Sequence, residues 1–187
     1  METKESNFSK IKLGMIWYED DTFSFEQIAD KRIKAVVELI KDGFIYGDLT
    51  VSEIMDMKEN QLNWETILMD IKFLSRDFNG IQSITWFDVD ELAEVYNHYD
   101  VVRKTFAMLG KSPRNGIYWT ISVSSGELNT GFLLDFTSGK IIEEHIEKRY
   151  DFRPVLKMKI EDDCDIKNHV SNAELCRILS SIFYTYQ

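Results

Sequence analysis

The chain has 187 residues, of which 44% are hydrophobic and 13% aromatic, and its formal net charge is −10 at pH 7. A chain of this length buries about 70% of its unfolded surface, so we expect it to fold without a disulfide or a metal ion. Residues 1–100 carry 10 basic and 21 acidic side chains, a net charge of −11, whereas residues 101–187 carry 12 and 11, a net charge of +1. This charge disfavours binding to nucleic acid or to an anionic membrane, and it favours a basic protein partner.

The cysteines and the N-terminal residues bear on the cellular compartment. Cys164 and Cys176 are the only cysteines, too few for the disulfide framework of a small secreted protein. The apolar run from Leu13 to Trp17 is shorter than the hydrophobic region of a signal peptide, and no later stretch has the length of a membrane span. We therefore expect a cytoplasmic protein with no membrane attachment. An acidic charge also keeps many cytosolic proteins soluble, an alternative that needs no partner.

The first predicted elements are a strand and a helix. Apolar and polar residues alternate over 10–18, which predicts a half-buried strand ending at the acidic turn Glu19-Asp20-Asp21. Ser24 and Gln27 then form a capping box. Apolar residues at helical spacing over 25–40 predict a helix that stops at Asp42-Gly43.

Helix caps followed by apolar residues predict three more helices before residue 110, and the last two of these helices end at a glycine, Gly80 and Gly110. The first begins at the capping box Thr50 and Glu53, the second runs from Asn63 to Phe78, and the third begins at Asp88 with Glu91 and runs to Leu109. A short apolar stretch over 84–87 predicts a strand between the last two helices.

Residues beyond 116 have the composition of strands. Residues 117–124 and 128–136 predict a hairpin, residues 155–160 alternate like a strand, and 141–150 fits either a strand or a helix. A last capping box, Ser171 with Glu174, predicts a closing helix over 171–186. The order predicts an α+β fold: an N-terminal strand and helices, then an antiparallel β-meander and a C-terminal helix. Residues 110–116 are too short for a linker, so we expect a single domain over residues 1–187.

The sequence contains no motif for a cofactor or a catalytic residue: the P-loop, the G-x-G-x-x-G fingerprint, the nucleophile elbow, the zincin helix and the EF-hand loop are all missing. We therefore predict no cofactor and no catalytic site. One alternative uses Asp88, Asp90 and Glu91, which stand where a strand passes into a helix and offer carboxylates to a divalent ion. A simpler interpretation is that Asp88 caps the helix and the other two complement its dipole.

Aromatic residues next to acidic ones provide a candidate partner-binding surface. Interface cores favour Trp and Tyr, and an acidic rim orients a basic partner. In the simpler alternative, Trp17 and Trp86 are core residues at strand ends. The predicted partner-binding residues are Trp17, Tyr18, Glu19, Asp20, Asp21, Asp88, Asp90 and Glu91.

In size, acidity and lack of catalytic motifs, the whole chain resembles the immunity proteins of bacterial contact-dependent and other polymorphic toxin systems. The resemblance implies a cytoplasmic, non-enzymatic inhibitor that covers the active site or an exosite of a basic toxin domain, frequently a nuclease. Two other functions stay open: a small metal-dependent hydrolase or nuclease using Asp88, Asp90 and Glu91, and a non-catalytic regulatory or adaptor domain.

Overall fold

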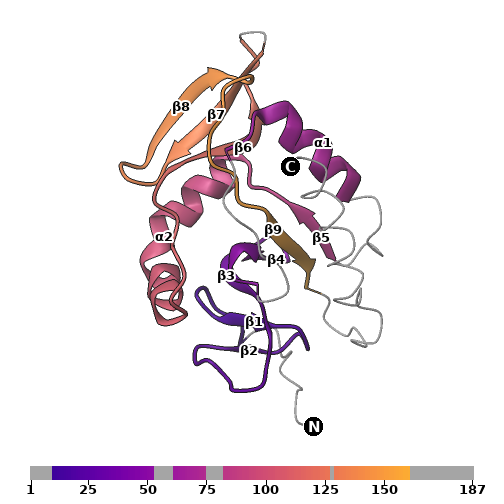
Figure 1. Cartoon of the computed structure of the whole chain (residues 1–187), viewed down its shortest axis with the longest axis vertical. Helices are drawn as coiled ribbons and strands as arrows, with labels where there is room; N and C mark the ends of the chain where they lie inside the picture. Colours follow the sequence, from indigo (N-terminus) through magenta and orange to yellow (C-terminus); the bar gives the residue numbers. More distant parts are fainter. Residues whose placement is uncertain (1–9, 53–60, 75–81, 127–128, 161–187) are drawn as a thin grey trace.

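The computed structural model describes residues 10–52, 61–74, 82–126 and 129–160, and in these ranges the chain has the predicted α+β fold (Figure 1). Two antiparallel sheets are accompanied by two α-helices and a short 3-10 helix among the described residues. The helix predicted over 171–186, residue Glu53 of the second capping box and both cysteines lie outside the described residues.

The larger sheet has six strands in the order β2-β1-β3-β4-β9-β5, and all neighbours are antiparallel. Its strands are β1 (Ile16–Tyr18), β2 (Phe23–Ser24), β3 (Ile33–Lys41), β4 (Phe44–Asp48), β5 (Gln82–Thr85) and β9 (Val155–Lys159), and the 3-10 helix η2 (Leu49–Val51) follows β4. The strands predicted over 84–87 and 155–160 are thus confirmed as β5 and β9, and the strand predicted over 10–18 forms only at its end, as β1. The late strand β9 is inserted between β4 and β5, so both ends of the described chain contribute to one sheet.

The smaller sheet is the predicted antiparallel meander, with the strand order β6-β7-β8. Its strands are β6 (Ile117–Val123), β7 (Thr130–Asp135) and β8 (Lys140–His145). The segment over 141–150, which fitted either element in sequence, therefore begins as a strand because it pairs along the whole of β7.

The helix predicted between Ser24 and Ile40 is wrong. Residues 33–41 form β3, and Asp42 and Gly43 form the hairpin turn to β4 with φ of 50° and 78°. Positive φ at both central residues is the geometry of a type I′ hairpin, for which Asp-Gly is a favoured sequence. The apolar spacing that imitates a helical stripe belongs to a central strand buried on both faces, where β-branched residues pack well.

Local capping places the two helices where the sequence predicts them. Helix α1 (Trp64–Leu74) begins after Asn63, whose Oδ1 accepts a hydrogen bond from Thr66 N at 2.9 Å. Helix α2 (Val89–Met108) begins with a complete capping box. Asp88 Oδ1 accepts from Glu91 N at 2.7 Å, and Glu91 Oε2 accepts from Asp88 N at 3.0 Å.

The largest core cluster lies where α2 meets both sheets. It combines apolar side chains of β1, β3 and β4 with those of α2, β6, β7 and β9. A second cluster occupies the other face of the large sheet, and a third lies between α1 and the small sheet. Figure 1 shows β1 and β2 at one end of the long axis and the small sheet at the other. The residues that follow β1 therefore lie at one tip of the described molecule.

Candidate functional site

The two aromatic residues before the acidic turn are buried. Trp17 and Tyr18 both have 0% exposure, because β1 lies between β2 and β3 and places one ring in each of two core clusters. In this structure neither ring has surface for a partner. A partner that binds at this tip would therefore contact the neighbouring residues, which these two aromatic side chains hold in place through hydrogen bonds.

Asp21 supports the turn from inside. Its Oδ1 accepts a hydrogen bond from Trp17 Nε1 at 2.7 Å and pairs with Lys34 Nζ at 2.9 Å. The Asp21 side chain is 8% exposed and that of Lys34 is 2% exposed. The Lys34 ammonium also lies 5.0 Å from the centre of a Trp17 ring. This carboxylate is therefore a structural anchor with little surface to offer a partner.

Asp20 is the exposed carboxylate of the turn. Its side chain is 51% exposed, it accepts hydrogen bonds from the backbone N and the hydroxyl of Thr22, and it pairs with Lys31 Nζ at 2.6 Å. Burial acts to raise the pKa of Asp20, but the bonds from Lys31 and Thr22 outweigh it and lower the pKa. Beside it, Glu19 Oε1 is buried and accepts no hydrogen bond from the described residues. The Asp20 carboxylate is therefore held in place at the surface of the turn.

The Tyr18 hydroxyl orders the segment that follows the turn. It donates to Glu26 O at 2.9 Å and accepts from Ile28 N at 2.8 Å, so one buried side chain holds two points of an otherwise exposed loop. Around these points Phe25 is 46% exposed and Ile28 is 38% exposed, and Glu26 and Asp30 are exposed as well. These two hydrogen bonds hold the loop backbone in place at residues 26 and 28.

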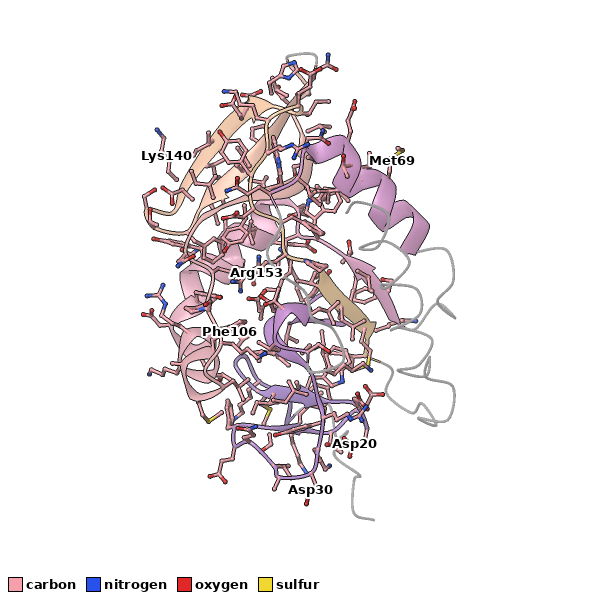
Figure 2. The ribbon with its side chains drawn as sticks, viewed as in Figure 1. Asp20, Asp30, Met69, Phe106, Lys140 and Arg153 are labelled. Atoms are coloured by element: carbon pink, nitrogen blue, oxygen red, sulfur yellow. The ribbon has the colours of Figure 1, made fainter. Side chains whose placement is uncertain are left out.

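We call residues 19–32 the acidic loop. It contains five acidic and two basic residues, a net charge of −3. Figure 2 shows Asp20 and Asp30 together at the tip of the described molecule, at the opposite end from Met69 and Lys140. The acidic loop therefore exposes the carboxylates of Asp20, Glu26 and Asp30 at this tip, while Asp21 is buried.

The second predicted acidic set, at the start of α2, is largely engaged in structure. Asp88 and Glu91 bind each other's backbone in the capping box, and Glu91 Oε1 also accepts from the Tyr46 hydroxyl at 2.9 Å. Asp90 is exposed. Within the described ranges, no group of three or more His, Cys, Asp or Glu side chains is arranged to hold a metal ion. The simpler interpretation, a capped helix start, therefore accounts for the geometry of Asp88 and Glu91.

A buried ion network that the sequence does not predict lies at the junction of the two sheets. Glu38 is the extra residue of a β-bulge in β3, since Val37 pairs with Gly47 and Leu39 with Tyr46. Bulges redirect a side chain out of the regular alternation of a strand. The nearest signal in the sequence is a single carboxylate in the middle of the apolar run of β3.

Four charged side chains from distant parts of the chain meet there. Arg114 donates from Nη2 to Glu38 Oε2 at 2.9 Å and from Nε to Glu38 Oε1 at 3.2 Å. Asp48 Oδ2 lies 3.3 Å from Arg153 Nη1 and 3.5 Å from Arg114 Nη2. All four side chains are at most 2% exposed. Such burial is tolerated because each charge has an opposite partner.

The two carboxylates of this network respond differently to burial. Burial is the strongest influence on Glu38 and raises its pKa to about 7, although Arg114 acts in the opposite direction. Burial also acts to raise the pKa of Asp48, but Arg153, Arg114 and Thr50 together lower it. Because Arg153 also donates to Ser112 O at 3.0 Å, the network ties the segment over 110–116 to the large sheet.

A cavity of about 320 Å³ opens beside this segment. Among the described residues that line it, the ionisable groups are the guanidinium groups of Arg103 and Arg114, and that of Arg114 is bound to Glu38. The Thr137 hydroxyl, also in the lining, donates to Asp135 at 2.7 Å. As described, this lining offers contacts and no acid–base pair. Its residues are Arg103, Pro113, Arg114, Asn115, Phe136 and Thr137.

Comparison with models of known protein families finds no match to this sequence, and comparison with curated protein sequences finds none either. Among the described residues, no helix combines the length and the apolar character needed to cross a bilayer.

Proposed function

We propose that this chain is a non-catalytic, cytoplasmic binding protein that inhibits a basic protein partner, in the manner of the immunity proteins it resembles. The observation that carries the proposal is the acidic loop, an ordered projection with a net charge of −3. Its exposed carboxylates belong to Asp20, Glu26 and Asp30. A partner with a basic surface would be attracted at long range and oriented as it approaches.

The geometry supports a binding function more directly than a metal-dependent one. Asp88 and Glu91, on which the hydrolase alternative depends, already bind the backbone of α2 and the Tyr46 hydroxyl. Diverting them to a metal ion would remove the helix cap, at a cost of about 1 kcal/mol. The carboxylates of Glu26 and Asp30 would need no such exchange to contact a partner.

The proposal predicts that a secreted protein with a basic C-terminal domain is encoded immediately upstream of this gene. That domain, once purified, is the partner used in the test, and a gene neighbourhood without such a protein counts against the proposal. Binding kinetics are measured between 50 and 500 mM salt, roughly the range over which surface charges become screened. Glu26→Gln with Asp30→Asn should lower the association rate about 3- to 10-fold at low salt and flatten its salt dependence. Asp30 has a φ of 66°, which Asn accepts as well as Asp, so the fold should be unaffected.

The matched control is Glu65→Gln with Glu147→Gln, which changes the net charge equally at exposed positions outside the acidic loop. This control should retain most of the association rate. If the wild-type chain does not bind the neighbouring domain, or if both double variants behave alike, the proposed function is wrong.

A further inference from the structure

We infer that Phe25 and Ile28 form the apolar centre of the partner-binding surface, and that the partner is a protein with an apolar pocket bordered by lysine and arginine side chains. This inference rests on the proposed function and adds the kind of surface that the partner must present.

The exposure of these two side chains does not result from a disordered segment. They lie three residues apart in a loop where the Tyr18 hydroxyl binds Glu26 O and Ile28 N. Phe25 is 46% exposed and Ile28 is 38% exposed. The structure thus holds two large apolar side chains in water at a place where the backbone has a defined position.

The surroundings of the pair indicate which chemistry would cover it. The exposed acidic residues of the same loop, Glu26 and Asp30, alternate with the apolar ones along the chain. Asp20, in the same loop, is held in place by a hydrogen bond from Thr22 and an ion pair with Lys31. An apolar centre with a charged rim is the usual anatomy of a protein interface. The same loop also carries the basic residues Lys31 and Arg32, but its net charge is still −3, so the complementary surface is basic around its pocket.

Tyr18 acts as a positioning residue in this arrangement. Its ring is buried in the core, and only its hydroxyl reaches the loop. Ordering a loop before it binds lowers the entropy lost on association, which strengthens binding without adding a contact. Removing the hydroxyl should therefore weaken binding although Phe25 and Ile28 are both still present.

The experiment uses the full chain and, as the probe, the purified basic domain that the proposed function predicts to be encoded next to its gene. Phe25→Ala with Ile28→Ala should raise the dissociation rate about 10- to 100-fold and leave the salt dependence of association as in the wild type. The matched control is Met69→Ala with Ile141→Ala, which shortens two side chains that are 69% and 47% exposed on α1 and β8. This control should bind like the wild type.

Tyr18→Phe provides the second arm. It should speed hydrogen exchange at the Ile28 amide and raise the dissociation rate, while the rest of the chain keeps its exchange pattern. A purely structural role for Tyr18 would instead change exchange throughout β1 and leave the dissociation rate of the folded protein unaltered.

The outcomes separate the two proposals. If the wild type binds with salt-dependent association but the Phe25 and Ile28 double variant dissociates no faster than the control, the inference fails and the proposed function survives. If the wild type does not bind the basic domain at all, the proposed function fails and the inference fails with it.

Discussion

At the scale of single residues, Glu38 is a carboxyl group that is fully buried and also paired with a cation, and these two features shift its pKa in opposite directions. The bulge in β3 directs its carboxylate into the junction of the two sheets, where Arg114 binds it through two nitrogen atoms. Asp48, Arg153 and Tyr99 also act electrostatically on this pair. Burial nevertheless raises the pKa of Glu38 to about 7.

This pKa predicts a dependence of stability on pH. Because the folded pKa lies above the ordinary value of 4.5, the folded chain binds the Glu38 proton more tightly than the unfolded chain does. The stability that this proton contributes is complete below pH 4.5 and is lost as the pH rises to about 7. The free energy of unfolding should therefore fall between pH 5 and pH 7.5 more steeply in the wild type than in Glu38→Gln.

Urea denaturation at intervals of half a pH unit measures this difference. Asp48, whose pKa is lowered, contributes stability that is lost only below its ordinary value of 3.8, so it does not interfere in this range. Parallel profiles for the wild type and Glu38→Gln would show that Glu38 stays ionised throughout.

At the scale of elements, the turn from β7 to β8 contributes to the contact between the small sheet and α2. Gly139, in the turn from β7 to β8, has a φ of +71°, and a Cβ placed there would lie 2.5 Å from Cε1 of Tyr96. Tyr96 in turn packs edge-on against Phe136, with ring centres 5.7 Å apart. A side chain at position 139 therefore disturbs both the backbone and the contact between the sheet and the helix.

Gly139→Ala should lower the free energy of unfolding by about 2–4 kcal/mol, since it combines an unfavourable φ with overpacking. Gly110→Ala is the matched control, because Gly110 has a φ of +64° and no atom within 4 Å of the added Cβ. It should cost only about 1–2 kcal/mol. Equal losses in thermal or urea melts would show that Tyr96 moves aside without cost.

At the scale of the whole molecule, buried contacts connect the parts of the chain on either side of residues 110–116, the one segment where the sequence suggests a domain boundary. The largest core cluster joins α2 and the first strands to β6, β7 and β9, and Arg153 holds the segment over 110–116 through Ser112. Contacts of this kind favour cooperative unfolding. The single domain over residues 1–187 stays a prediction.

Thermal melts test it. Unfolding followed by far-ultraviolet circular dichroism and by tryptophan fluorescence should give the same midpoint, because Trp17 and Trp119 belong to different sheets. Two separate transitions, or a stable proteolytic fragment ending near Gly116, would contradict a single cooperative unit.

The success of the sequence-based predictions follows the range of the interactions involved. The start of α2 was predictable because Asp88 and Glu91 are three residues apart and form their capping box locally. The β6–β7 hairpin was predictable because the composition of its two strands is also a local signal. The α+β class followed from helical signals before residue 110 and strand signals after residue 116. The helix predicted over 25–40 failed because its apolar spacing suits a strand buried on both faces equally well, and pairing of β3 with β1 and β4 decided between them.

The candidate site divides in the same way. The amino-acid sequence alone determined the acidic character of residues 19–21 and the clustering of acidic residues in the first half, since charge is a property of composition. Only the tertiary structure decided that Tyr18 is buried and that Phe25 is exposed. It also brought Glu38 to Arg114, 76 residues away. Exposure and long-range pairing depend on which elements pack together, and that free energy is shared among contacts that no local pattern records.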